Sequence, residues 1–207
     1  MMESGVLSKS KFLQKNESIS RASELVRKNV DRAADLVQRF KTLSTTQASH
    51  DVRDIDVVAY IGDMLTALEY QHSEIKGRVH ISASQAIEMK LDLVALDKVM
   101  VSLLDNAMQH AFPRGLDEAK ITITLSVVTH QQKNVLELSF HDNGCGIDQA
   151  VLPLIFDPFY TTSRDTGAVG LGLHAAFNYV TQSLHGTIQC HSDLDSGSEF
   201  ILHIPID

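Results

Sequence analysis

The run from Asp142 to Gly146, Asp-Asn-Gly-Cys-Gly, has the residue types that point most directly to ligand chemistry, and it ends a segment that alternates as a strand does. Glycines let a backbone approach a flat ligand closely. A buried Asp carboxylate can accept a hydrogen bond from an exocyclic amine such as that of adenine. A hairpin turn is the alternative, because Asn-Gly between apolar runs favours the type I′ geometry.

Asn106 is a second candidate, on the apolar side of a helix predicted over residues 93–111. A buried amide needs partners, and an amide oxygen is a suitable hard ligand for a phosphate-bound Mg²⁺. The alternative is an Asn bonded to helix backbone. His110 lies one turn further on and could reach a phosphate oxygen, although an exposed helical His is the commoner case.

A glycine-rich run containing Gly167, Gly170 and Gly172 leads into another predicted helix, residues 171–184. Unpaired N–H groups and the helix dipole both favour an anion at such a place, so the pattern suits phosphate. A surface loop is the alternative. A Rossmann fingerprint is disfavoured, because residues 161–167 are polar and turn-like where that motif requires a strand.

Three aromatic residues, Phe156, Phe159 and Tyr160, precede the glycine-rich run. Such a cluster usually packs in a core. Because a polar, glycine-bearing stretch follows, the aromatics could also anchor the base of a lid that closes over a ligand, between Phe156 and Val169.

The elements that must position these residues fall into one domain, predicted over residues 50–207, and a segment before it. From Ile19 to Leu43 apolar residues recur at three- and four-residue steps in an approximate heptad, which predicts a long helix that pairs with another helix. We assign residues 16–49 to this dimerisation-type helix and its linker, and residues 1–15 to a disordered or tag-like start.

Within residues 50–207 the periodicity is mixed, which predicts an α/β fold of the α+β sandwich type. Apolar and polar residues alternate along the strands, so one face of the sheet can be exposed to solvent. The predicted strands cover residues 55–58, 79–82, 121–127, 136–140, 188–190 and 200–204, and the predicted helices cover 58–70, 93–111 and 171–184.

The composition excludes several classes of function. A net charge of −8 argues against a nucleic-acid partner, since that affinity depends on Lys and Arg that neutralise phosphates. Two cysteines without paired spacing predict neither a disulfide framework nor a metal cage, which favours a cytoplasmic setting. No apolar run approaches the roughly 20 residues that a membrane span needs, so no membrane contact is expected.

The order of the four segments resembles the N, G1, F and G2 boxes of the GHKL superfamily, which includes histidine kinases, Hsp90, gyrase B and MutL. The histidine kinase branch is the most similar in the sequences of three segments: Phe156–Thr162, His185–Ile188 and Ser196–Phe200. The resemblance covers roughly residues 50–207. It implies a Bergerat-type fold, with a mixed, mostly antiparallel sheet and helices on one face, that binds ATP and Mg²⁺.

The resemblance also implies a role for each matching residue. Asp142 contacts the adenine amine, Asn106 holds Mg²⁺, and Ser198 replaces a strand Thr near the adenine. The other implied nucleotide-binding residues are Gly144 and Gly146 at the base, Phe156 at the base of the lid, and Gly167, Gly170, Leu171 and Gly172 at the phosphates.

Two positions depart from the family pattern. Ser102 stands where kinases often carry another Asn and where hydrolysing relatives carry a general-base Glu, so steady ATP hydrolysis is disfavoured. Gln109 occupies a frequent Lys position. The phosphate charge then has to be met by His110 or by Arg164, which become the candidate catalytic residues.

The function implied by the resemblance is transfer of the ATP γ-phosphoryl group to a His, for relay to an Asp of a response regulator. No His-Glu-x-x-x-Pro acceptor motif occurs. His50-Asp51, where the linker meets the domain, is the alternative phosphoacceptor, but we expect His50 to be a solvated linker residue. We therefore expect an acceptor helix outside this chain, a parent protein that forms a homodimer through the N-terminal helix, and no autophosphorylation of the chain alone. The alternatives are an anti-sigma-type Ser/Thr kinase and a non-catalytic nucleotide-binding adaptor.

Overall fold

The computed structural model describes residues 17–24, 26, 27, 30, 50–72, 75–113, 115, 118–130, 133–162 and 168–206. The chain divides into two units, residues 1–46 and 47–207. In the first unit the described residues are helical, and Ile19, Val26 and Val30 are exposed. The rest of the predicted pairing helix and the start over residues 1–15 lie outside the described residues, so the domain boundaries and the pairing role stay predictions.

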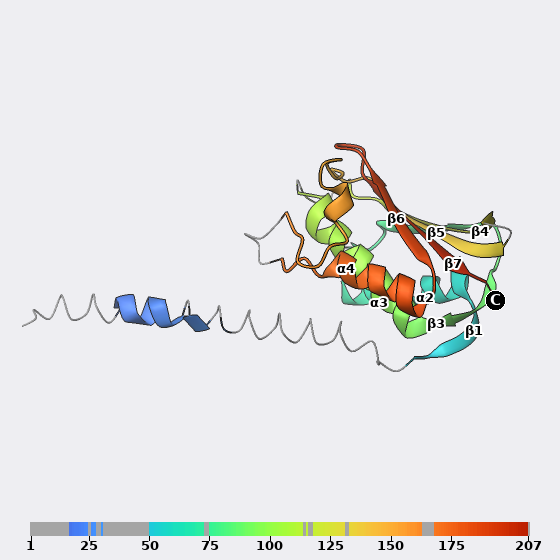
Figure 1. The fold of residues 1–207 in the computed structure, drawn as a ribbon, viewed down its shortest axis with the longest axis horizontal. Coiled ribbons are helices and arrows are strands. Elements are labelled where there is room, and N and C mark those ends of the chain that lie inside the picture. The colour runs from blue at the N-terminus through green and yellow to red at the C-terminus, as the bar shows by residue number, and fades with distance from the viewer. Residues whose placement is uncertain are drawn as a thin grey trace, which may run out of the picture. The chain divides into compact units, whose positions relative to one another are not determined.

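The second unit contains a five-stranded sheet with the strand order β2-β4-β5-β7-β6 (Figure 1). β2 runs parallel to β4, and the other three pairs are antiparallel. The strands span Val79–Ala83 (β2), Ile121–His130 (β4), Lys133–Asp142 (β5), Thr187–Ser192 (β6) and Ser198–Pro205 (β7). The predicted mixed, mostly antiparallel sheet is confirmed.

Three helices cover one face of this sheet: α2 (Val57–Gln71), α3 (Leu93–Asn106) and α4 (Gly172–Asn178) (Figure 1). The alternation along the strands explains why only one face is covered. In β7 every second residue is buried, and Phe200 lies opposite Phe140 of β5 in the same core. Side chains of a strand alternate between faces, so the residues between them face away from the helices.

A second, two-stranded antiparallel sheet pairs β1 (Val52–Asp56) with β3 (Glu88–Asp92). The sequence predicted β1 a few residues too late and did not predict β3, because Glu88-Met-Lys-Leu-Asp offers only two apolar residues in alternation. The carboxylate of Asp56 caps α2 by accepting from the Val58 N–H at 3.0 Å, and it also accepts from the Ile87 N–H at 3.2 Å.

The helices α3 and α4 both end in π-helical turns instead of continuing as α-helix. These turns are Ala107–Ala111 after α3 and Tyr179–Ser183 after α4, and a 3₁₀ turn, Leu152–Leu154, lies in the segment predicted to be irregular. At the end of the first turn the Ala111 carbonyl accepts from the Cys145 N–H at 2.8 Å. The helix end is therefore bonded to the loop after β5, and such π turns recur at functional sites.

Candidate functional site

A row of three buried polar residues crosses the covered face of the sheet at one end. Asp142 at the end of β5 lies opposite Ser198 at the start of β7, and Ser198 lies opposite Ser192 at the end of β6. All three are buried. The neighbouring row on the same face consists of Phe140, Phe200 and Cys190, so the polar row borders the apolar core.

Asp142 is 1 % exposed, which is unusual for a carboxylate. Burial raises the pKa of Asp142, while the backbone N–H groups of Gly144 and Ser198 and the nearby His141 oppose the rise. The Gly144 N–H donates to Oδ1 at 2.9 Å. A carboxylate has about four acceptor positions, so Asp142 has the capacity to accept a further hydrogen bond from an amine.

Ser192 is a residue of the site that the sequence argument missed. Its hydroxyl oxygen accepts from the Ile147 N–H at 2.7 Å, donates to the Gly197 carbonyl oxygen at 2.7 Å and lies 3.1 Å from the Ser198 hydroxyl. It joins β6 to the loop after β5. The available signal was a Ser at the third position of the inward-facing series Ile188, Cys190, Ser192.

The glycines after β5 permit close approaches that a side chain would block. A Cβ on Gly144 would overlap Ala111 and lie 2.8 Å from Oδ1 of Asp142. Gly146 has φ +71°, and a Cβ there would overlap the carbonyl of Asp193. After β5 the chain passes to the turn at Leu152–Leu154 and to α4, so the hairpin-turn interpretation of Asn-Gly is wrong.

Asn106 is the last residue of α3, and the π turn that follows it is bonded through Ala111 to Cys145. The Asn-bearing helix and the Asp-bearing strand therefore meet at one loop. Asn106 is half-buried, and in the described part of the chain its side-chain amide makes no hydrogen bond. The amide oxygen suits a hard cation such as Mg²⁺, with most other ligands supplied by phosphate and water.

His110 is half-buried in the same π turn, not exposed as in the commoner case. Burial lowers the pKa of His110 below its ordinary value of 6.5. The imidazole is therefore neutral at pH 7 and offers an N–H donor more readily than a positive charge.

The aromatic segment divides between core and surface. The ring of Phe156 lies 5.6 Å from that of Phe177 and 6.5 Å from that of Phe200, and Tyr160 also packs against the core. Phe159 is 46 % exposed and has φ +66°. The core-packing interpretation thus holds for two of the three aromatics.

Gly170 packs against the C-terminal end of the aromatic segment, at Phe159 and Tyr160. It has φ +71°, and a Cβ there would overlap the Tyr160 carbonyl, while its own carbonyl accepts from the Phe159 N–H at 2.8 Å. Leu171 is buried, so only its backbone can face a ligand, and Gly172 begins α4 with open space around it. Arg164 and Gly167 lie outside the described residues.

An open hollow of about 440 Å³ lies beside β6, and it shares only Phe156 with the predicted site. Its lining residues are Gln149, Leu152, Pro153, Phe156, Gln189, Cys190 and His191. Neither Asp142 nor Asn106 contributes to it, so this hollow is not the site that the sequence predicts.

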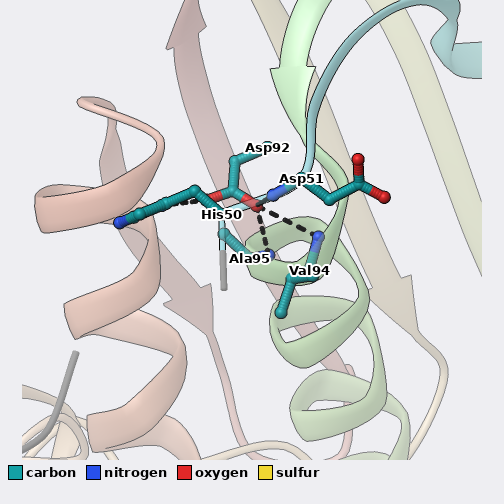
Figure 2. Close-up of polar contacts among 5 residues, drawn as sticks. All are labelled: His50, Asp51, Asp92, Val94 and Ala95. Atoms are coloured by element: carbon teal, nitrogen blue, oxygen red, sulfur yellow. Dashed lines mark hydrogen bonds and ion pairs between the residues drawn. The ribbon is translucent and has the colours of Figure 1, made fainter. Parts of the chain in front are cut away.

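His50 has a specific partner, although we expected a solvated linker residue. Its ring is 59 % exposed, but Nδ1 lies 2.5 Å from Oδ2 of Asp92 (Figure 2). Oδ1 of Asp92 caps α3 by accepting from the N–H groups of Val94 and Ala95 at 3.1 and 3.3 Å. Burial would raise the pKa of Asp92, but the hydrogen bonds from His50 and the backbone outweigh burial and lower it.

The residues that the structure describes include no group of three or more His, Cys, Asp or Glu side chains placed to hold a metal ion. No helix among them has the length and apolar character needed to cross a membrane.

Comparison with known proteins places these features in a family. Residues 91–207 match the family described as histidine kinase-, DNA gyrase B-, and HSP90-like ATPase. The chain is 27 % identical over 184 residues to the signal transduction histidine-protein kinase ArlS of Staphylococcus epidermidis, which covers 86 % of this chain and 38 % of that protein. It is 32 % identical over 133 residues to the autoinducer 2 sensor kinase/phosphatase LuxQ of Vibrio vulnificus, covering 62 % of this chain and 15 % of that protein.

Solved structures show the same fold at lower sequence identity. The catalytic domain of the histidine kinase ThkA has a TM-score of 0.61 at 22 % identity, and the match covers 75 % of this chain and 96 % of that one. Full-length ShkA in complex with AMPPNP has a TM-score of 0.67 at 18 % identity, covering 92 % of this chain and 39 % of that one.

The chain spans well under half the length of the curated relatives quoted above. Its sheet, with helices on one face, is the Bergerat fold of histidine kinase catalytic domains. The family match covers more than half of the chain, and the relatives are sensor kinases. The chain therefore belongs to the histidine kinase-, DNA gyrase B-, and HSP90-like ATPases, as a histidine kinase-like catalytic domain of the sensor kinase type.

Proposed function

We propose that this chain binds Mg·ATP and transfers the γ-phosphoryl group to a His on an acceptor helix outside the chain, for relay to an Asp of a response regulator. The observation that carries the proposal is the burial of Asp142 at the end of β5, with Gly144 held against its carboxylate. A buried acceptor beside a glycine backbone suits a flat base that carries an exocyclic amine.

In this proposal the two ends of the nucleotide meet different elements. Asp142 accepts from the adenine amine, with Ser198 beside it on β7, and Gly144 and Gly146 let the backbone approach the base. Asn106, at the end of α3, offers its amide oxygen to Mg²⁺. Phe156 lies at the base of the proposed lid. The phosphates bind to the backbone of Gly167, Gly170, Leu171 and Gly172.

The bound Mg²⁺ would neutralise phosphate charge, and the residues of the chain would mainly position the nucleotide. His110 would donate its N–H to a phosphate oxygen, and Arg164 is the cationic candidate. Ser102 on α3 replaces the Glu that would activate water, so transfer to a His is favoured over hydrolysis.

The partners that we propose follow from relatives. One solved neighbour, with a TM-score of 0.66 at 18 % identity, is the histidine kinase ThkA in complex with the response regulator protein TrrA. The exposed apolar residues Ile19, Val26 and Val30 suit a paired helix in a homodimer. We place the domain in the cytoplasm, with the parent protein free to carry a membrane anchor.

A calorimetric titration with Mg·ATP and Mg·GTP tests the proposal. We expect saturable binding of ATP to the wild type and weak binding of GTP. The Asp142→Ala variant should lose about 10- to 100-fold of this preference, because the buried partner of the amine is gone. Lys90→Ala, a change at an exposed residue of β3, serves as the control. Equal affinity of the wild type for both nucleotides would refute the proposal.

A further inference from the structure

His174 of α4 makes two hydrogen bonds that fix its tautomer. Nδ1 lies 2.9 Å from the carbonyl oxygen of Phe156, and Nε2 lies 3.1 Å from Nδ2 of Asn178. A carbonyl oxygen only accepts, so Nδ1 carries the hydrogen. An amide nitrogen only donates, so Nε2 carries none. The ring therefore donates through Nδ1 to the aromatic segment and accepts through Nε2 from Asn178.

These bonds tie the start of the aromatic segment to the same helix that begins at the glycines. The Phe156 ring packs on Phe177, one turn after His174, and the end of the segment is held by the bond from the Phe159 N–H to Gly170. Gly170 also lies against the Tyr160 carbonyl. Residues 156–160 are thus held at both ends by residues 170–178.

We propose that His174 is a positioning residue for the nucleotide phosphates, which rests on the proposed ATP-binding function. Through its Nδ1–H it holds the Phe156 carbonyl against α4, and the held segment in turn fixes the backbone of Gly170. His174 itself touches no part of the nucleotide. Loss of its bond releases one end of residues 156–160, so the backbone N–H groups at Gly170–Gly172 lose their fixed placement.

The base pocket is built from other elements. Asp142, Gly144 and Ser198 belong to β5, the loop after it and β7, and neither of the two hydrogen bonds of His174 described above reaches them. The proposed role of His174 therefore concerns the phosphates of the nucleotide and not its base. A change at His174 should weaken the binding of phosphates and leave the binding of the base intact.

Two substitutions of His174 both remove the imidazole ring, but only one of them keeps a hydrogen-bond donor to the Phe156 carbonyl. His174→Asn places an amide nitrogen where Nδ1 stands, and it keeps the donor to Phe156. His174→Gln places its amide at the position of Nε2 and loses that donor. His80→Gln, on an exposed residue of β2, is the matched control.

The experiment measures the dissociation constants of Mg·ATP and adenosine for the full chain by calorimetry. We expect His174→Gln to weaken Mg·ATP about tenfold and adenosine less than twofold, with His174→Asn and His80→Gln both within about threefold of the wild type. Asn178→Ala leaves the Nδ1–H donor to Phe156 in place and should stay within about threefold of the wild type. His174→Ala removes the same donor as His174→Gln, and it keeps the test decisive if the Gln variant does not fold.

Three outcomes would overturn the positioning role while ATP binding by the wild type stands. They are unchanged Mg·ATP affinity in His174→Gln (or in His174→Ala, if the Gln variant does not fold), an equal loss for ATP and adenosine, and a loss in His174→Asn as large as that in His174→Gln. A wild type that binds neither ligand would instead refute the proposed function, and the positioning role with it.

Discussion

Asp142 and Ser198 lie opposite each other across β5 and β7, and the Ser198 backbone N–H opposes the rise that burial causes in the pKa of Asp142. Both residues are buried, and they lie in strands that are more than 50 residues apart in the chain. A carboxylate in this place costs stability when it is ionised, because burial disfavours the charged form. In the proposed function this acceptor serves nucleotide binding rather than stability.

The first prediction concerns the pH dependence of stability. The folded pKa of Asp142 is raised above its ordinary value of 3.8, so ionisation lowers the free energy of unfolding as the pH rises through the folded pKa. Asp142→Asn keeps an acceptor for the Gly144 and Ser198 N–H groups but carries no charge. Urea unfolding should show that this variant gains stability relative to the wild type at pH 7, and that the gain shrinks at pH 4. A difference independent of pH would contradict the assignment.

The second prediction separates two glycines by their surroundings. Gly146→Ala should lower the free energy of unfolding by about 3 kcal/mol or more, since φ is +71° and the Cβ would overlap the Asp193 carbonyl. Gly172→Ala should change it by less than about 1 kcal/mol, because a Cβ there meets open space at a helix start. Chemical denaturation of both variants provides the measurement, and equal costs would contradict the described packing.

The third prediction concerns the proton balance of ATP binding. His110 is neutral in the free protein because burial lowers its pKa. A phosphate beside it would favour the charged form, so binding should take up a proton and should tighten by roughly threefold to tenfold between pH 8 and pH 6. Calorimetry in buffers of different ionisation enthalpy measures this uptake. His110→Gln should abolish it, and uptake that persists in this variant would exclude His110 as the phosphate partner.

The fourth prediction concerns the start of α3. Asp92→Ala should lower the free energy of unfolding by about 1–2 kcal/mol through loss of the cap, whereas Asp92→Asn should cost less because it still accepts. The wild-type pKa of Asp92 is lowered, so its ionisation stabilises the fold above pH 3.8, and this contribution is lost as the pH falls through the folded pKa. His50→Ala should cost under about 1 kcal/mol, since the ring is mostly exposed. Thermal unfolding that ranks the Asn variant below the Ala variant would contradict the capping role.

The fifth prediction uses the two thiols. Burial, with the nearby Asp142 as a second cause, raises the pKa of Cys190 to about 12. In a Cys145→Ser background, Cys190 should react with a thiol reagent at pH 8 at least about 100-fold more slowly than a small free thiol, because the thiolate is the reactive form. Rapid modification of Cys190 in the folded chain would contradict the raised pKa of its thiol.

Local periodicity in the sequence was enough to predict most elements of the second unit. Alternation along residues 121–127 and 200–204 predicted β4 and β7, and the three- and four-residue steps from Leu93 to Ala111 predicted α3 and its π turn as one helix. Motif order also predicted the family, because four segments with the right chemistry follow one another along the chain. These signals lie within windows of about 5–20 residues, where the period of a strand or helix is visible.

What the sequence could not determine depends on contacts between distant segments. β3 has too short an alternation to be predicted and exists because β1 pairs with it. Ser192 has no local mark, and it enters the site only because β6 and β7 are in one register. The bond from His174 to Phe156 requires α4 to lie against a loop 18 residues earlier. By itself the sequence determined the family, most of the elements and the segments from which the proposed site residues come. Only the tertiary structure decided that Asp142, Ser198 and Ser192 form one row and that His174 reaches the aromatic segment, because register and packing between distant segments are set by side chains that no local window contains.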